Sequence, residues 1–157
     1  MKVLIADDSA EIRKRLSNMI LNIQKVDLIE QADNVEEAIQ IIQNSKPDVV
    51  ILDIQMSGGN GIDVLSTITK KNNYPVVIML TNYPYPQYRD LCFEYGADFF
   101  FDKSDEFEKV SEIFLHISLT SIQKNKKDKN IKGEDIYDGK INDKYERTKI
   151  SMDETEN

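Results

Sequence analysis

The chain has 157 residues, with 20 lysines and arginines against 28 aspartates and glutamates, one cysteine, one histidine and no tryptophan. The net charge of −8 argues against a generic nucleic-acid coat or a binder of anionic membranes, because both need a basic face. A single cysteine excludes an internal disulfide and a cysteine-rich zinc site. The longest apolar run, Val76–Leu80, is far shorter than the ~18 residues of a membrane span. Because Val3–Ala6 leads directly into two aspartates, it is not a signal peptide, and we expect a cytoplasmic protein.

The charge is unevenly distributed along the chain. Residues 1–122 hold 11 basic and 19 acidic side chains, whereas residues 123–157 hold 9 of each. The second segment has few large apolar residues, so it cannot bury enough surface to offset the entropy lost on ordering. We expect one domain at residues 1–122 and a polar, disordered tail at 123–157. The tail is either a solvated end without a role or carries a short binding element around Ile136–Tyr145.

Short apolar runs of strand length alternate with amphipathic stretches of helix length through residues 1–122. In chain order, the pattern predicts the strand Val3–Ala6, the helix Ala10–Ile23, the strand Leu28–Ala32, a helix between Asn34 and Pro47, the strand Val49–Leu52, the helix Ile62–Lys71, the strand Val76–Leu80, a helix at about Gln87–Tyr95, the strand Phe99–Phe101, and a helix from Ser104 or Asp105 to about Ile122. Such alternation predicts an α/β domain with a parallel sheet. Cys92 and His116 fall within the last two expected helices. There we expect a buried, inert thiol and an imidazole that is structural or solvated and not catalytic.

Polar side chains follow every expected strand, at the edge where ligands bind in open parallel sheets. In chain order these residues are Asp7 and Asp8, Asp33, Asp53, Thr81, and Asp102 with Lys103. Carboxylates brought together there raise each other's pKa, and Mg²⁺, which prefers oxygen ligands, removes that penalty. The ammonium group of Lys103 and the hydroxyl of Thr81 complete a cradle for a phosphoryl group, with Asp53 as the nucleophile.

The motifs at these positions resemble those of receiver domains of bacterial two-component response regulators. The matching segments are LIADDS at Leu4–Ser9, VVILDIQM at Val49–Met56 followed by Gly58–Gly61, VVIMLT at Val76–Thr81, and GADFFFDKS at Gly96–Ser104. The resemblance covers residues 1 to about 122. It implies a flavodoxin-like (βα)5 three-layer sandwich whose parallel sheet has the strand order 2-1-3-4-5. It also implies that Asp53 accepts a phosphoryl group from a sensor histidine kinase, in a reaction that needs Mg²⁺ or Mn²⁺.

The resemblance further implies a role for each residue of the cradle. Asp8 and Asp53 would ligate the metal together with the backbone carbonyl of Gln55, Asp7 would act mainly through water, and Thr81 and Lys103 would bind the phosphate. Phe100, three residues before the lysine, is the expected switch residue. On phosphorylation it would move inward behind Thr81 and alter the face made by the fourth helix, fifth strand and fifth helix. The alternative for Phe100 is an ordinary core residue.

Gln55 and Tyr83 occupy the positions that flank the path of the hydrolytic water in this family. A bulky Tyr83 would shield the phosphate and lengthen its life. An unchanged dephosphorylation half-life in Tyr83→Ala would refute this hypothesis, and the alternative is a solvent-facing loop residue.

Two positions depart from the pattern of the family. Ser57 stands where proline usually follows Met56, and we expect Gly58, Gly59 and Gly61 to make that loop more mobile. Ser104 stands where proline often follows the lysine, which leaves the Lys103–Ser104 peptide undecided between cis and trans. Ser104 is instead a candidate cap for the fifth helix.

These motifs and cradle residues together predict a stand-alone receiver that signals to a downstream protein, without direct DNA or membrane binding. The alternative is a phosphorelay intermediate that passes the phosphoryl group to a histidine phosphotransfer protein.

A less favoured alternative is a phosphohydrolase with an aspartyl nucleophile. Such enzymes need a second aspartate as general acid two residues after the nucleophile, where this chain has Gln55. We therefore expect no enzyme beyond its own phosphorylation and dephosphorylation. A nucleotide-binding module and a receiver that works without phosphate are weaker alternatives.

Overall fold

The computed structural model describes residues 1–68 and 75–126, with side chains described as far as Thr120. The elements are β1 (Lys2–Ala6), α1 (Ala10–Ile20), β2 (Leu28–Ala32), α2 (Val35–Ser45), β3 (Val49–Leu52), β4 (Gln55–Met56), β5 (Gly59–Asn60), α3 (Gly61–Thr67), β6 (Val76–Thr81), α4 (Pro86–Glu94), β7 (Phe99–Asp102) and α5 (Lys109–Lys126). Met1–Ile122 form one compact unit. The predicted tail, apart from the end of α5, lies outside the described residues.

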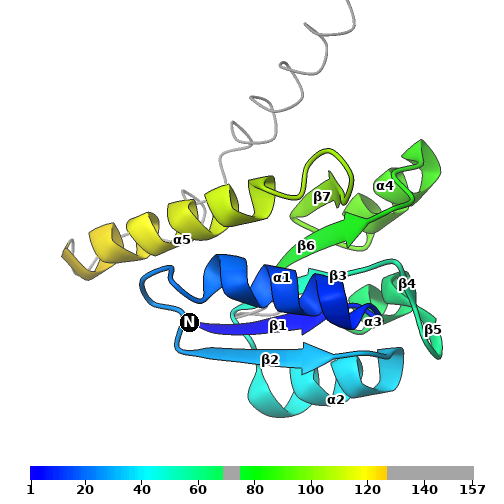
Figure 1. The fold of residues 1–157 in the computed structure, drawn as a ribbon, viewed down its shortest axis with the longest axis horizontal. Coiled ribbons are helices and arrows are strands. Elements are labelled where there is room, and N and C mark those ends of the chain that lie inside the picture. The colour runs from blue at the N-terminus through cyan, green and yellow to red at the C-terminus, as the bar shows by residue number, and fades with distance from the viewer. Residues whose placement is uncertain (69–74, 127–157) are drawn as a thin grey trace, which may run out of the picture. The chain divides into compact units, whose positions relative to one another are not determined.

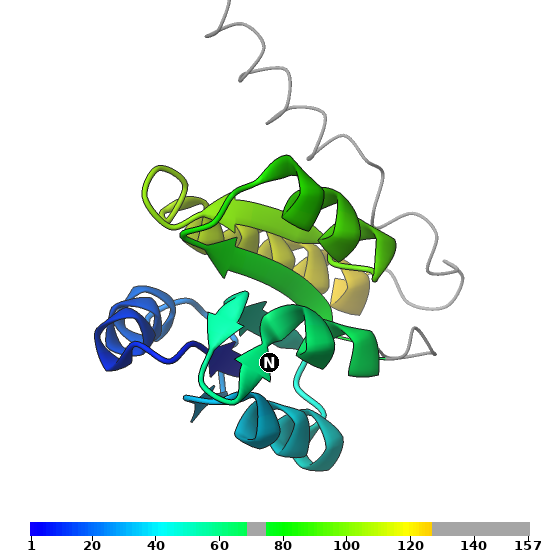
Figure 2. The same cartoon turned by 90° about the vertical axis from the view of Figure 1, so that its right-hand side faces the viewer.

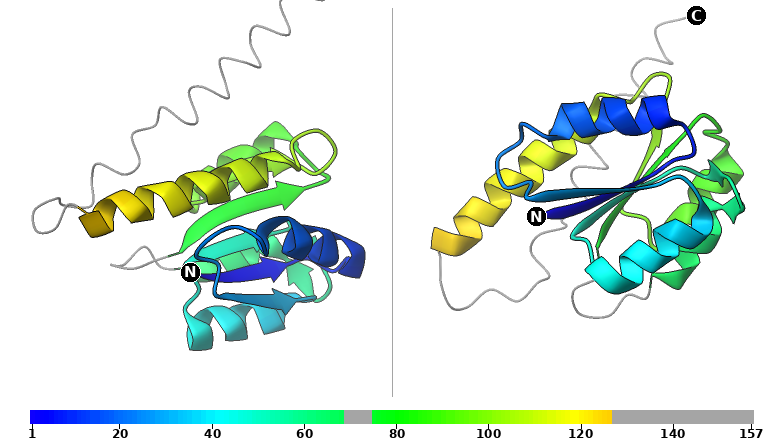
Figure 3. Two further views of the ribbon diagram at one scale, coloured as in Figure 1. Left: turned by 60° about the vertical axis from the view of Figure 1, so that its left-hand side comes forward. Right: turned by 60° about the horizontal axis from the view of Figure 1, so that its bottom comes forward.

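Five parallel strands form the central sheet, in the order β2-β1-β3-β6-β7. This is the expected order 2-1-3-4-5, because β4 and β5 pair only with each other in a small antiparallel hairpin. Helices α1 and α5 cover one face of the sheet, while α2, α3 and α4 cover the other (Figures 1, 2 and 3). The predicted flavodoxin-like three-layer sandwich is therefore confirmed.

Burial along the central strands explains why their sequences are continuously apolar. All residues of β3 and Val77–Thr81 of β6 are buried, because helices pack on both faces of the sheet. Two predicted helix starts have the hydrogen bonds that their sequences indicate. Ser9 Oγ accepts from the backbone N–H of Ile12 at the start of α1, and Asn34 Oδ1 accepts from that of Glu37 at the start of α2, at 2.8 Å.

The largest difference from the sequence-based expectations is the start of α5, which begins at Lys109 and not at Ser104 or Asp105. Asp102 and Glu106 form a separate turn ahead of the helix by bonding to each other. The backbone N–H of Glu106 donates to Asp102 O at 2.9 Å, and that of Asp102 donates to Glu106 Oε2 at 3.0 Å. The N–H of Ser104 donates to Asp102 Oδ1, so Ser104 does not cap the helix. The Lys103–Ser104 peptide bond is trans.

The other helices differ from the expected ones mainly at their ends. Helix α1 stops at Ile20 and not at Ile23. Helix α3 stops at Thr67, and the predicted end at Lys70–Lys71 lies outside the described residues. The apolar spacing of Gln87–Tyr95 predicts that Tyr95 faces inward, but it is exposed at the end of α4, whereas Cys92 is fully buried as expected. Within the described part of the chain, no helix has both the length and the apolar character needed to cross a membrane.

Candidate functional site

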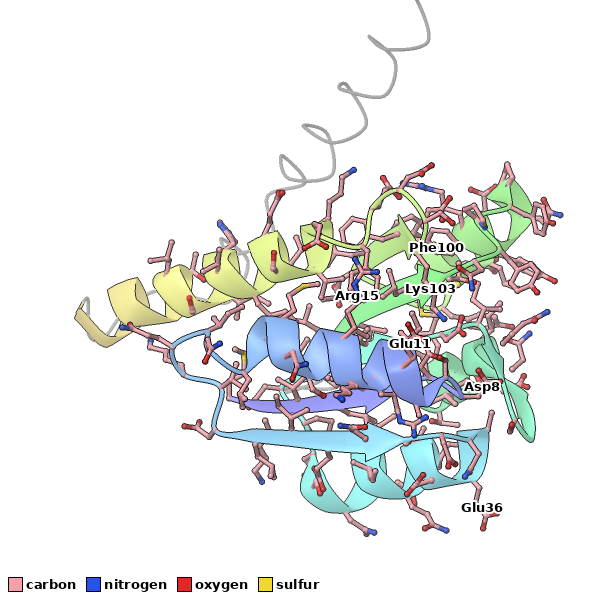
Figure 4. The ribbon with its side chains drawn as sticks, in the orientation of Figure 1. Asp8, Glu11, Arg15, Glu36, Phe100 and Lys103 are labelled. Carbon is pink, nitrogen blue, oxygen red and sulfur yellow. The ribbon has the colours of Figure 1, made fainter. Side chains whose placement is uncertain are left out.

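Three aspartates meet beyond the ends of β1 and β3. Asp7, Asp8 and Asp53 each offer a carboxylate oxygen, and these oxygens lie within 4.8 Å of one another. The backbone extends the sheet up to this point, since the N–H of Asp53 donates to Ala6 O at 2.9 Å. Asp7 and Asp53 are buried, whereas Asp8 is exposed. Figure 4 shows Asp8 at this edge of the sheet, where the strands point.

Lys103 supplies the positive charge of the cluster. Its Nζ lies 2.6 Å from Asp7 Oδ2 and 2.7 Å from Asp53 Oδ2, and the Lys103 residue is only 8% exposed. The backbone N–H of Lys103 donates to Thr81 O at 2.9 Å, so β6 and β7 fix where its side chain begins. The sequence therefore places these aspartates and Lys103 correctly at one edge of the sheet.

Burial and neighbouring charge shift the pKa values of the buried residues Asp53 and Lys103 in opposite directions. Burial raises the pKa of Asp53, and the hydrogen bond and charge of Lys103 offset this only in part. Burial alone would lower the pKa of Lys103, but the hydrogen bonds and charges of Asp53 and Asp7 raise it above its ordinary value. Lys103 is therefore a cation at neutral pH, and the Asp53 carboxylate is held in a site where further positive charge stabilises it.

One carboxylate oxygen of the cluster has no hydrogen-bond partner. Among the described residues, none donates to Asp53 Oδ1, although this atom is buried. Both oxygens of Asp7 are engaged, since Oδ1 accepts from the N–H of Ser9 at 2.9 Å and Oδ2 contacts Lys103. A buried, unpaired carboxylate oxygen is unfavourable unless another group binds it. Asp53 Oδ1 and the exposed Asp8 are therefore the carboxylate groups open to a further ligand, and such oxygens suit a hard divalent cation.

Thr81 is the last residue of β6, and Phe100 lies in the neighbouring strand β7, which leads to Lys103. Thr81 is fully buried, and its Oγ1 accepts from the backbone N–H of Tyr83 at 3.1 Å. Phe100 is 2% exposed, and the Arg89 guanidinium lies 5.6 Å from its ring centroid. The inward Phe100 is thus in contact range of α4. The switch role of Phe100 stays a prediction.

The Tyr83 side chain is half-buried and not simply directed into solvent. Its ring lies 6.2 Å from that of Tyr85, which in turn lies 6.0 Å from that of Tyr88. These spacings fit tilted aromatic pairs. Gln55, the other residue expected near the water path, is exposed in β4. The effect of both residues on dephosphorylation stays a prediction.

The glycine-containing loop after Asp53 forms backbone bonds within itself and to the start of α2, and its expected mobility stays a prediction. Gly59 and Asn60 pair with Met56 and Gln55, and Ser57 O accepts from the N–H of Val35 at 3.2 Å. Gly61 approaches Asp53 so closely that a Cβ at this position would lie 1.8 Å from Asp53 O. The N–H of Gly61 also donates to Ile54 O at 2.7 Å. Gly61 is therefore a structural requirement of the site that its sequence context did not reveal.

We expect Gly61→Ala to lower the free energy of unfolding by about 3 kcal/mol, because its methyl group collides with the Asp53 backbone. Gly58→Ala is the matched control. Nothing lies within 4 Å of its Cβ position, so only its φ of +79° is unfavourable, at a cost of about 1 kcal/mol. Urea unfolding of both variants measures the difference. Equal destabilisation would show that the close approach does not constrain the site.

Residues 3–114 match the response regulator receiver domain family, and the chain belongs to it. It is 31% identical over 137 residues to the sensory transduction protein LytT of Bacillus anthracis, covering 87% of this chain and 54% of that protein. It is 39% identical over 79 residues to a protein-glutamate methylesterase/protein-glutamine glutaminase of Bacillus subtilis, covering 50% of this chain and 22% of that protein. The chain thus spans about half the length, or less, of these curated relatives.

Solved structures agree with this assignment. The response regulator domain of Thermotoga maritima CheB superimposes with a TM-score of 0.66 at 27% identity, over 79% of this chain and 97% of that chain. A chain of the CheX–CheY–BeF3–Mg²⁺ complex of Borrelia burgdorferi gives a TM-score of 0.61 at 30% identity, over 73% and 89% of the two chains. This chain is therefore a receiver domain of the two-component class.

Proposed function

We propose that Asp53 is the phosphoacceptor of this receiver, and that its donor is the phosphohistidine of a sensor histidine kinase or of a histidine phosphotransfer protein. A carboxylate oxygen of Asp53 forms a bond to phosphorus while the phosphorus–nitrogen bond of the donor breaks. The imidazole nitrogen leaves with the electron pair. The observation that carries the proposal is the buried, unpartnered Asp53 Oδ1 within a cluster that already contains a buried ammonium group.

Lys103 and Thr81 act on the phosphoryl group in this proposal. The ammonium group of Lys103 stabilises negative charge on the phosphoryl oxygens as the group is transferred, and the Thr81 hydroxyl donates a hydrogen bond to one of them. Both residues stand at the ends of β6 and β7, where the bond from Lys103 N–H to Thr81 O fixes the backbone from which their side chains extend.

A divalent cation, Mg²⁺ or Mn²⁺, fits the side of the cluster where the exposed Asp8 and the unpartnered Asp53 Oδ1 lie. Asp8 and Asp53 would hold it with the backbone carbonyl of Gln55, and Asp7 would act mainly through water because its oxygens are engaged by Ser9 and Lys103. When bound, the cation neutralises charge on the carboxylates and on the phosphoryl oxygens. The similarity to a chain of the CheX–CheY–BeF3–Mg²⁺ complex of Borrelia burgdorferi supports this choice.

The proposed output is a change of the face formed by α4, β7 and α5. Phosphorylation draws the Thr81 hydroxyl towards the phosphate, Phe100 fills the space behind it, and the face then binds a downstream protein. Equal affinity of phosphorylated and unphosphorylated protein for that partner would contradict this switch. A phosphorelay intermediate uses the same site and differs only in passing the group onward.

The enzymatic activity of longer relatives is not carried over to this chain. The Bacillus subtilis relative is named as a methylesterase and glutaminase, but the match covers 22% of it. We propose that this chain is a non-enzymatic, cytoplasmic signalling module without direct DNA binding. A phosphohydrolase is disfavoured because Gln55 cannot protonate a leaving group.

Incubation with phosphoramidate and Mg²⁺, followed by intact-mass measurement, tests the proposed function. We expect one added phosphoryl group, and none when EDTA removes the cation. No gain of mass in the presence of Mg²⁺ would contradict the proposal. Steady release of product from a generic phosphate ester would instead indicate a phosphohydrolase.

Binding of Mg²⁺ should also stabilise the fold. At ten times its dissociation constant, a ligand specific to the native state adds about 1.4 kcal/mol to the free energy of unfolding, which raises the midpoint by about 4–6 °C for a domain of this size. We expect most of this shift to vanish in Asp8→Asn and to persist in Asp90→Asn, an exposed aspartate of α4. Thermal unfolding with and without Mg²⁺ measures it, and equal shifts in both variants would place the cation elsewhere.

A further inference from the structure

The loop between β7 and α5 carries Lys103 and contains no helix or strand between Lys103 and Glu108. Its first half is held by the bonds between Asp102 and Glu106. Its second half is anchored by Phe107, whose side chain is only 3% exposed. Beyond these bonds, the end of the loop next to α5 contacts a side chain of another helix.

Arg15 of α1 makes such a contact. Its guanidinium carbon lies 3.8 Å from the centroid of the Phe107 ring, and its Nη2 lies 3.0 Å from Glu108 Oε1. The first is a close cation–π contact and the second an ion pair, both from one side chain. Figure 4 shows Arg15 on the side of α1 that faces this loop, with Lys103 just after the end of β7. Arg15 therefore connects the helix that follows Asp7 and Asp8 to the loop that follows Lys103.

We propose that Arg15 is a positioning residue for Lys103. The Lys103 Nζ must stay within 2.6–2.7 Å of two carboxylates that come from different strands. The bond from its N–H to Thr81 O fixes one side of the Lys103 backbone, and the loop continues from the other side. Arg15 holds the far end of that loop against α1. A displaced ammonium group stabilises the charge of the transferring phosphoryl group less well, since such stabilisation falls steeply with misplacement. This inference rests on the proposed phosphorylation of Asp53.

Three variants separate this role from a merely structural one. Arg15→Met keeps the apolar stem and removes the cation, and Arg15→Lys restores the cation without the planar group that stacks on Phe107. Lys14→Met removes an exposed charge from the same helix and serves as control. Each is measured by amide hydrogen exchange of residues 103–108, by the initial rate of phosphorylation from phosphoramidate, and by the Mg²⁺ dependence of the thermal midpoint.

We expect faster exchange in residues 103–108 of Arg15→Met because the loop loses a cation–π contact and an ion pair. We also expect a phosphorylation rate about three- to tenfold lower, because the Lys103 ammonium group is then less well placed. The apparent Mg²⁺ affinity should be unchanged because Asp8 and Asp53 are untouched. Arg15→Lys should fall between Arg15→Met and the wild type, and Lys14→Met should match the wild type.

Two results would overturn the inference. One is a rate and an exchange pattern in Arg15→Met that equal those of Lys14→Met. The other is a loss of rate in proportion to a loss of Mg²⁺ affinity, which a general disturbance of the site produces. If the wild type takes up no phosphoryl group, the proposed function fails, and the role of Arg15 in catalysis fails with it. Exchange of residues 103–108 still shows independently whether Arg15 holds the loop.

Discussion

Asp53→Asn will take up no phosphoryl group from phosphoramidate and Mg²⁺, whereas Asp63→Asn will take up one at the wild-type rate. The amide of asparagine is a poor nucleophile, and no other described carboxylate combines burial with an unpartnered oxygen beside Lys103. Asp63 is the matched control because it is an exposed aspartate in the first turn of α3. Intact-mass measurement over time gives both rates.

The control for folding is the far-ultraviolet circular dichroism spectrum, which should be the same in both variants. A phosphoryl group on folded Asp53→Asn would contradict the assignment of the nucleophile. Loss of uptake in Asp63→Asn would show that charge around the site, and not the Asp53 carboxylate itself, governs the reaction.

The second large effect is on stability. Lys103→Met should lower the free energy of unfolding by about 3 kcal/mol at neutral pH without added cation, because it leaves two buried carboxylates without their counter-charge. The pKa of Asp53, already raised by burial, would rise further without Lys103, which limits the loss. Urea unfolding measures this value.

The double variant Asp53→Asn with Lys103→Met tests the cause of that loss. Removing one carboxylate should recover part of the stability, whereas an effect due only to packing of the lysine stem would persist unchanged. Added Mg²⁺ should also recover more stability in Lys103→Met than in the wild type, since the cation then replaces the missing charge. A loss of less than about 1 kcal/mol in Lys103→Met would show that water, and not Lys103, compensates the carboxylates.

The sequence predicts the sheet and the site edge well because both depend on short-range patterns. Apolar runs such as Val49–Leu52 are buried on both faces, and the residue that follows such a run must lie at the edge of the sheet. Asp53 and Lys103 are 50 residues apart in the chain, yet their positions after two strands of one parallel sheet suffice to bring them together.

The features missed by the sequence depend on contacts between distant segments or on backbone geometry. Nothing near Gly61 indicates that it touches the backbone of Asp53, and the contact of Arg15 with Phe107 joins residues far apart in the chain. Before α5 the chain forms a separate turn, closed by the bonds between Asp102 and Glu106, and periodicity alone does not distinguish this turn from the first turn of the helix.

The most direct test of the central claim is to locate the phosphoryl group. Reduction of the phosphorylated protein with borohydride converts an aspartyl phosphate into homoserine, which peptide mass spectrometry then places in the sequence. We predict homoserine at position 53 only after treatment with phosphoramidate and Mg²⁺, and none when EDTA is present. Homoserine at another aspartate, or a stable phosphate on a serine or threonine, would contradict the account.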